Sequence, residues 1–94
     1  MDLRNFAGLP NILTTKKRFL MTKEQFDAGI GEFYEKEAIS KVYALIGPRD
    51  DDAFMIIDEW GERYQESNGG ILITQGKTYH YLPYETIIAL TGMR

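Results

Sequence analysis

The chain has 94 residues, a net charge of −3 and no cysteine, which excludes disulfides, thiol catalysis and cysteine-ligated zinc. A chain of this length forms one domain, so we expect residues 1–94 to fold together, with residues 1–11 as a flexible or docked N-terminal arm. No apolar run reaches the ~18–20 residues of a membrane span, and the N-terminus lacks the basic start of a signal peptide, so we expect a cytoplasmic protein without a membrane partner.

The segment after the arm, Ile12–Met21, could form a strand. It contains the basic run Lys16-Lys17-Arg18, which could contact phosphates. Three charges give only weak and salt-sensitive binding, so a solvated turn or strand edge is the favoured interpretation of this run.

A helix is expected to begin at Thr22. The Thr22 hydroxyl and the Gln25 side chain have the spacing of a capping box, in which each accepts a hydrogen bond from the other's backbone amide. The apolar residues that follow form a stripe at helical spacing: Phe26, Ile30, Phe33 and Tyr34.

The next apolar set lies on a face turned by about 140° from this stripe, so one straight helix would expose one set or the other. We therefore expect a break near Glu35–Glu37 and a second short helix that ends at Gly47-Pro48. A strand over Lys41–Ile46 is the competing interpretation, because its aromatic and β-branched residues suit strands.

The clearest helical pattern follows three aspartates, Asp50–Asp52, which suit the N-terminus of a helix. One predicted face is apolar and includes Trp60 and Tyr64, and Asn68-Gly69 is expected to end the helix. The opposite face would hold Met55, Asp58, Glu59, Glu62 and Glu66.

Two strand-like runs, Ile71–Thr74 and Lys77–Tyr81, are expected to pair through a Gln75-Gly76 turn. Pro83 should end the second strand, and Tyr84–Leu90 could be a short helix or a further strand. The predicted fold class is α+β, with two or three short helices plus a β-hairpin or small antiparallel sheet. The order of the last helix and hairpin suggests a winged-helix-like arrangement.

Residues 50–66 carry seven acidic groups and one basic group, Arg63. This asymmetry predicts an acidic helix face that contacts a partner, joined by two tyrosines that alternate onto one face of the hairpin. The alternatives are a solvated helix face and a weak site for a divalent cation. The predicted partner-binding residues are Asp51, Asp52, Met55, Asp58, Glu59, Glu62, Glu66, Tyr79 and Tyr81.

The sequence offers no catalytic constellation. His80 is the only histidine, and no nucleophile or carboxylate is placed beside it by the sequence, so a structural or surface role is expected. Gly29-Ile30-Gly31 lacks the lysine and serine of a phosphate loop. We therefore expect a protein that is not an enzyme and has no cofactor and no bound metal.

These features predict a small non-enzymatic protein-binding module, an inhibitor or adaptor that occupies a partner's surface. The expected partner is a protein with a basic patch, for example a nucleic-acid-binding protein, and small accessory proteins of phages, such as anti-CRISPR proteins, have this character. The alternative is a winged-helix DNA-binding regulator that would use Lys16–Arg18, Arg49 and Lys77. Direct nucleic-acid binding is disfavoured by the acidic residues, and a homodimer is compatible with the exposed tyrosines.

Overall fold

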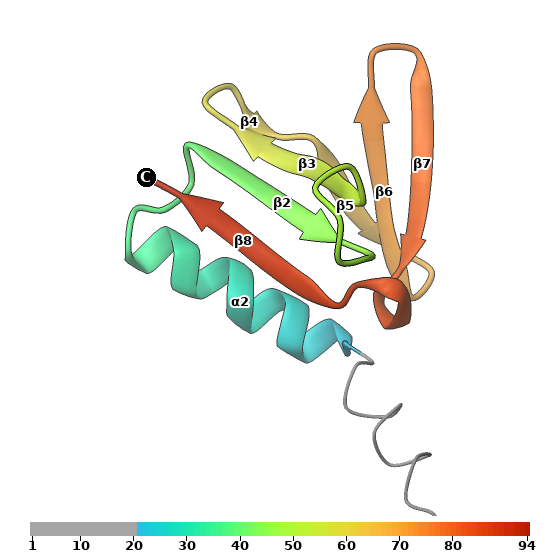
Figure 1. Cartoon of the computed structure of the whole chain (residues 1–94), viewed down its shortest axis with the longest axis horizontal. Helices are drawn as coiled ribbons and strands as arrows, with labels where there is room; N and C mark the ends of the chain where they lie inside the picture. The colour runs from blue at the N-terminus through green and yellow to red at the C-terminus, as the bar shows by residue number, and fades with distance from the viewer. Residues whose placement is uncertain (1–20) are drawn as a thin grey trace, which may run out of the picture.

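The computed structural model describes residues 21–94; the predicted arm, the Ile12–Met21 strand and the basic run lie outside this range, except for Met21. In the described part, one α-helix precedes seven strands, and the 3₁₀ helix η1 joins the last two (Figure 1). The elements are α2 (Lys23–Glu35), β2 (Lys41–Leu45), β3 (Ala53–Asp58), β4 (Gly61–Glu62), β5 (Tyr64–Ser67), β6 (Gly70–Gln75), β7 (Thr78–Pro83), η1 (Tyr84–Thr86) and β8 (Ala89–Met93).

Helix α2 begins as its sequence predicts. The Gln25 amide donates to Thr22 Oγ1 at 3.1 Å, and the Thr22 amide donates to Gln25 Oε1 at 2.9 Å, which completes the capping box. The predicted break near Glu35–Glu37 is also confirmed, since α2 ends at Glu35.

A left-handed residue, Glu37 at φ 58°, ends the helix. The Ala38 amide donates to Phe33 O at 2.8 Å and the Glu37 amide to Tyr34 O at 3.1 Å, which is the hydrogen-bond pattern of a Schellman motif. Glycine is the usual residue at this position because any side chain costs free energy there.

Replacement of Glu37 by glycine is therefore expected to raise the free energy of unfolding by about 0.5–1 kcal/mol, measured by urea denaturation. Glu35→Gly is the matched control: it lies in the last turn of α2 and should lower stability by up to about 1 kcal/mol. A Glu37→Gly variant less stable than the wild type would contradict this account of the helix end.

The strands form two antiparallel sheets, with the orders β4-β3-β2-β8 and β5-β6-β7. Arg63 lies between β4 and β5 and joins the sheets through its backbone. Its amide donates to Ile56 O of β3 at 2.8 Å, and its carbonyl accepts from the Thr74 amide of β6 at 2.8 Å. The β4–β5 segment is thus one bent strand that leaves the first sheet and enters the second.

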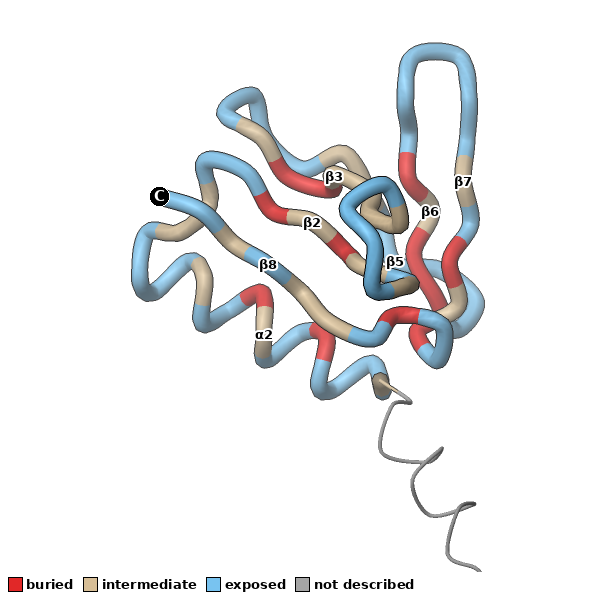
Figure 2. The backbone as a smooth tube through the Cα atoms, viewed as in Figure 1, coloured by how far each residue is buried: buried red, intermediate tan, exposed pale blue. Residues whose placement is uncertain are grey.

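The core lies between the two sheets and α2, and Figure 2 shows buried segments on the helix and on strands of both sheets. Phe26 of α2 is fully buried, and its ring lies 5.5 Å from that of Tyr64 and 5.4 Å from that of Tyr84. One helical side chain therefore contacts both the second sheet and η1. The buried apolar residues are Phe26, Ile30, Val42, Ala44, Ile56, Ile57, Ile71, Ile73, Leu82, Tyr84 and Ile87.

The predicted α+β class with two or three helices is wrong, because the described chain is mostly β and has α2 as its one α-helix. The expected second short helix is strand β2, as the competing interpretation of Lys41–Ile46 proposed. Val42 and Ala44 are buried, whereas the residues on either side of each are more exposed, and this two-residue period is that of a strand. The winged-helix arrangement is also wrong, so the DNA-binding alternative loses the fold on which it depended.

The predicted acidic helix after Asp50–Asp52 is instead β3, β4 and β5. Val42 pairs with Ile57 and Tyr43 with Met55, so Ile56 is an extra residue, a β-bulge. The bulge lets the neighbours Ile56 and Ile57 both be buried, although adjacent residues of a regular strand point to opposite faces. The resulting apolar spacing resembles that of a helix.

The remaining turns also belong to hairpins. Asn68 and Gly69, at φ 51° and 79°, form the two-residue loop between β5 and β6 and do not end a helix. The predicted β6–β7 hairpin is present, but Gln75 pairs with Thr78, so its turn is Gly76-Lys77, one residue later than expected. The ambiguous Tyr84–Leu90 segment contains η1 and the first residues of β8.

Candidate functional site

The most exposed large hydrophobic residue of the described chain is Trp60, which is 77% exposed. Trp60 lies at the turn between β3 and β4, at one end of the four-stranded sheet (Figure 1). A tryptophan left in water forgoes the burial that ordinarily stabilises it, and at interfaces this residue type often dominates the binding energy.

The turn that carries Trp60 is held by Asp58. Its Oδ1 accepts from the Trp60 amide at 2.8 Å, and its Oδ2 accepts from Arg63 Nε at 3.0 Å. Burial raises the pKa of Asp58, but the hydrogen bonds from Arg63 and Trp60 outweigh this, and the pKa is below its ordinary value. Gly61 completes the turn at φ 125°, a conformation that other residues rarely adopt.

A groove of about 460 Å³ runs beside Trp60, between the β3–β4 turn and the segment that follows α2. Tyr34, near the end of α2, also lines the groove and is 44% exposed. Its hydroxyl donates to Glu62 Oε2 at 3.0 Å, which fixes its position. The groove is lined by Tyr34, Glu37, Ile39, Ser40, Ile57, Asp58, Glu59, Trp60 and Gly61, and we call it the Trp60 groove.

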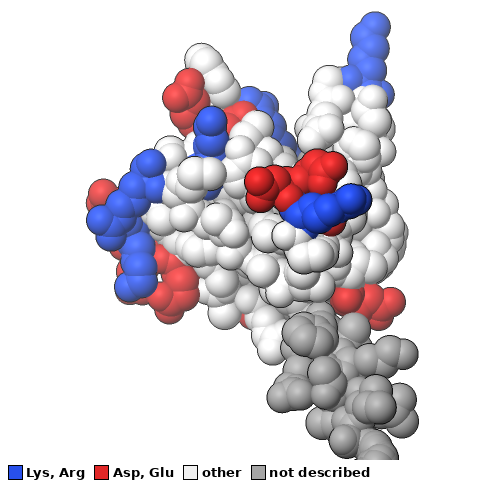
Figure 3. All heavy atoms as spheres, viewed as in Figure 1, with Lys and Arg blue, Asp and Glu red and all other residues white. Residues whose placement is uncertain are grey.

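The Trp60 groove is acidic. Glu37, Asp58 and Glu59 contribute carboxylates, and none of the described residues that line it is a lysine or arginine. Arg63 neutralises Asp58, so Glu37 and Glu59 supply most of the negative field inside the groove. Figure 3 shows acidic atoms at the β3–β4 turn, whereas the tip of the β6–β7 hairpin carries a basic side chain.

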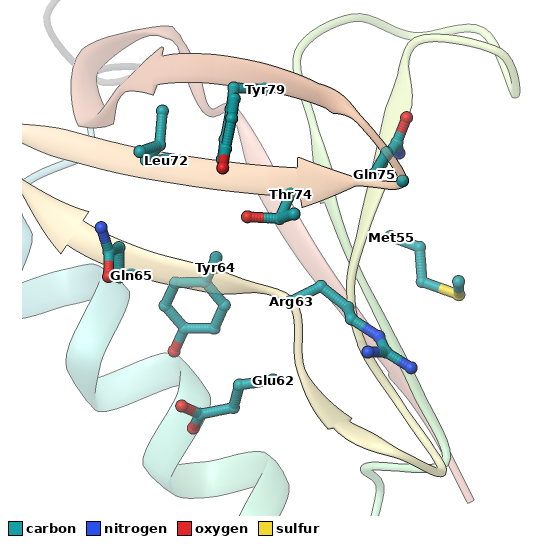
Figure 4. A pocket seen from close by; sticks show the side chains of 10 residues that line it. Met55, Glu62, Arg63, Tyr64, Gln65, Leu72, Thr74, Gln75 and Tyr79 are labelled. Atoms are coloured by element: carbon teal, nitrogen blue, oxygen red, sulfur yellow. The ribbon is translucent and has the colours of Figure 1, made fainter.

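A second hollow, of about 700 Å³, lies where the two sheets bend apart (Figure 4). Met55 and Arg63 line one side, and residues of β5, β6 and β7, among them Tyr79, line the other. Glu62 and Tyr64 border this hollow, but their side chains point toward α2. We call this hollow the bend cleft. Its lining combines apolar, polar and oppositely charged residues, so it lacks the excess of negative charge found in the Trp60 groove.

The residues predicted to form one acidic surface are dispersed over the fold. Asp58 and Glu59 lie in the Trp60 groove, whereas Met55, Glu62 and Tyr79 line the bend cleft. Tyr81 is 46% exposed and donates through its hydroxyl to Asn68 O. A continuous acidic helix face therefore does not exist in the described residues.

Asp51 and Asp52 lie in the β2–β3 connection, away from both hollows. Asp52 Oδ2 accepts from the Arg49 amide at 3.3 Å and lies 3.6 Å from Arg49 Nε, which orders the connection. The Asp51 side chain is 81% exposed and lies 3.9 Å from the same guanidinium. Asp52 thus has a structural role, and Asp51 is a solvated surface charge.

Glu66 belongs to a polar seam between α2 and β5. It accepts from the Tyr84 hydroxyl and lies 3.7 Å from Lys23 Nζ, which also pairs with Asp27 at 2.7 Å. The hydrogen bond from Lys23 holds the pKa of Asp27 below its ordinary value. Glu66 is therefore occupied by contacts within the fold.

Buried tyrosines in this seam predict a loss of stability at alkaline pH. Burial raises the pKa of Tyr64 and of Tyr84 above the ordinary value; Glu62 and Glu66 raise that of Tyr64 further, and the hydrogen bond to Glu66 raises that of Tyr84 further. The folded state thus holds these protons more tightly than the unfolded state, so the contribution is complete below about pH 10 and is lost as the pH rises further.

Each of the two tyrosines should lower the free energy of unfolding by at most about 1.4 kcal/mol per pH unit above pH 10, as measured by denaturant titrations at several pH values. A Tyr64→Phe variant should show a shallower alkaline decline. An identical decline in the variant would show that Tyr64 does not contribute.

His80 is half-buried; its Nε2 lies 3.1 Å from Gln75 Oε1 and its ring 5.2 Å from that of Phe54. The first contact joins β7 to β6 and the second joins β7 to β3, which suits a structural role. Among residues 21–94, no group of three His, Asp or Glu could hold a metal ion, and no helix is long and apolar enough to cross a membrane.

Trp60 and Tyr34 were not predicted as site residues, because the helical patterns placed each of them on an apolar, inward face. A signal was present: Asp58-Glu59-Trp60-Gly61 has aspartate and glycine at the first and fourth positions, as many turns do. Comparisons of the chain with protein-family models, curated proteins and solved structures found no match, so the inferences about its function come from its own residues.

Proposed function

We propose that this protein is a small non-enzymatic protein-binding module that captures a partner through the Trp60 groove. The observation that carries the proposal is the 77% exposure of Trp60 on a turn fixed by Asp58. A rigid turn lowers the entropy that binding must offset, because the anchor is already in position. Such a module would act as an inhibitor or adaptor by covering a surface of its partner.

The partner is expected to present a basic patch. Glu37 and Glu59 surround the aromatic anchor with negative charge, and complementary charges favour encounter and exclude acidic partners. Encounter should slow as salt is added, because these carboxylates lie at the solvent-exposed rim. We also propose that the protein works in the cytoplasm; a chain without cysteine is compatible with that reducing compartment.

The test is partner capture from the native cell by tagged protein, followed by mass spectrometry. Trp60→Ala should weaken the affinity for the captured partner by about 30-fold or more, as loss of a central tryptophan does at other interfaces. Circular dichroism should show an unchanged fold, because the Trp60 side chain is exposed.

Tyr79→Ala is the matched control, since Tyr79 is also an exposed aromatic residue, 66% exposed, but borders the bend cleft. Capture should survive this change. If Trp60→Ala leaves capture intact while Tyr79→Ala abolishes it, the binding surface is the bend cleft and the assignment to the Trp60 groove is wrong.

A further inference from the structure

We propose that the Trp60 groove accepts one arginine side chain of the partner, with the guanidinium held between Trp60 and Tyr34. The inference rests on the proposed function and specifies the chemistry that the groove recognises. It follows from three features of the groove: its two aromatic residues, two carboxylates that no ion pair engages within residues 21–94, and the strained residue at its edge.

The two aromatic residues come from different elements. Trp60 stands on the β3–β4 turn and Tyr34 at the end of α2, and both line the same groove. The faces of tryptophan and tyrosine attract cations, tryptophan most strongly, and a planar guanidinium also stacks on them. The hydrogen bond from the Tyr34 hydroxyl to Glu62 positions the tyrosine ring, and the bond from the Trp60 amide to Asp58 fixes the backbone that carries the indole.

Two carboxylates remain to pair with the cation. Asp58 already accepts from Arg63 and from the Trp60 amide, whereas no ion pair engages Glu37 or Glu59 within residues 21–94. A carboxylate can accept two parallel hydrogen bonds from a guanidinium, a geometry that a lysine ammonium cannot provide. This difference favours arginine over lysine.

The backbone conformation of Glu37 also supports a binding role for this residue. Glu37 occupies the left-handed conformation, φ 58°, in which glycine would be more stable. Strained residues cluster at functional sites, and here the strained residue contributes a carboxylate to the groove. The strain is accounted for if that carboxylate binds the partner.

The chain contains a direct reporter of occupancy, because Trp60 is its only tryptophan. Fluorescence of the full chain can be titrated with three probes: N-acetyl-arginine amide, N-acetyl-lysine amide and N-acetyl-citrulline amide, the neutral isostere of the arginine probe. The arginine probe should give a saturable change with a dissociation constant on the order of millimolar, as suits one side chain. The citrulline probe should bind at least fivefold more weakly, and the lysine probe should lie between them.

A Glu37→Gln, Glu59→Gln double variant should weaken the arginine probe about three- to tenfold. Glu85→Gln, an exposed carboxylate on η1, is the matched control and should leave binding unchanged. Equal affinity for the citrulline and arginine probes, or a lysine probe as tight as the arginine probe, would overturn the inference. So would the absence of saturation, or a double variant that binds as the wild type does.

These outcomes separate the two proposals. If the captured partner depends on Trp60 but the arginine probe does not bind, the protein-binding function stands and the arginine inference fails. If the probe binds but Trp60→Ala leaves partner capture intact, the groove recognises arginine but is not the surface that captures that partner, and the proposed function fails.

Discussion

Replacement of Phe26 by alanine is expected to lower the free energy of unfolding by about 3–5 kcal/mol, the usual cost of removing a buried phenylalanine ring. The ring is fully buried and contacts the rings of both Tyr64 and Tyr84, so its loss would leave a cavity where α2, β5 and η1 meet. The free energy of unfolding of a domain of this size is about 5–15 kcal/mol, so this single change removes a large part of it. Urea denaturation followed by circular dichroism measures the effect.

Phe26→Leu is the control, because it keeps much of the apolar volume and should cost clearly less than alanine. A second comparison is Phe33→Ala, at a site on α2 that is only partly buried against the core. If Phe26→Ala costs no more than Phe33→Ala, Phe26 is not the centre of the helix contact.

Removal of the Asp58 carboxylate by alanine should have the second largest effect on the free energy of unfolding, a loss smaller than that of Phe26→Ala but larger than that of an exposed surface charge. Two hydrogen bonds are lost together, one to the Trp60 amide and one charge-assisted bond to Arg63. The same change should loosen the turn, so partner capture should weaken even in the fraction that stays folded. Denaturant titration and capture assays on one preparation measure both effects.

Asp51→Ala is the matched control, since the Asp51 side chain is 81% exposed and should change stability by less than about 0.5 kcal/mol. The low pKa of Asp58 adds a pH signature: its contribution is present above the ordinary aspartate value and is lost as the pH falls below it. Stability that declines equally in acid for the wild type and Asp58→Ala would show that this carboxylate does not contribute.

Local signals predicted one part of the fold correctly. The capping residues Thr22 and Gln25 and the phase change after Tyr34 placed both ends of α2, because capping and helical periodicity depend on residues a few positions apart. The β6–β7 hairpin was also predicted, with its turn displaced by one residue.

The long acidic helix was predicted wrongly because its evidence was periodicity alone. The bulge at Ile56 is defined by the partner strand β2, so its effect on the apolar spacing could not be separated from a helical repeat. The dipeptide Asn-Gly occurs both at helix ends and in hairpin loops. Here the apolar run of β6 follows Asn68-Gly69 and pairs with β5, so the dipeptide forms a hairpin loop.

The candidate site was predictable in character but not in position. The acidic composition of residues 50–66 drew attention to Asp58 and Glu59, which line the candidate groove; that they bind a partner stays a prediction. Tyr34 reaches the same groove from α2 through the tertiary fold, and no local pattern relates it to Trp60. The charge of a short segment follows from its sequence, whereas a groove between elements that are distant in the sequence depends on the tertiary fold.

The backbone of Arg63 has a consequence for how the protein unfolds. Its amide belongs to the ladder of the first sheet and its carbonyl to that of the second, while its guanidinium holds Asp58. Neither sheet can be released without breaking bonds of the same residue, so the two should melt together in one cooperative transition. Amide hydrogen exchange in β3 and β6 should then report a common opening free energy, and the Trp60 turn would remain ordered until the whole domain opens.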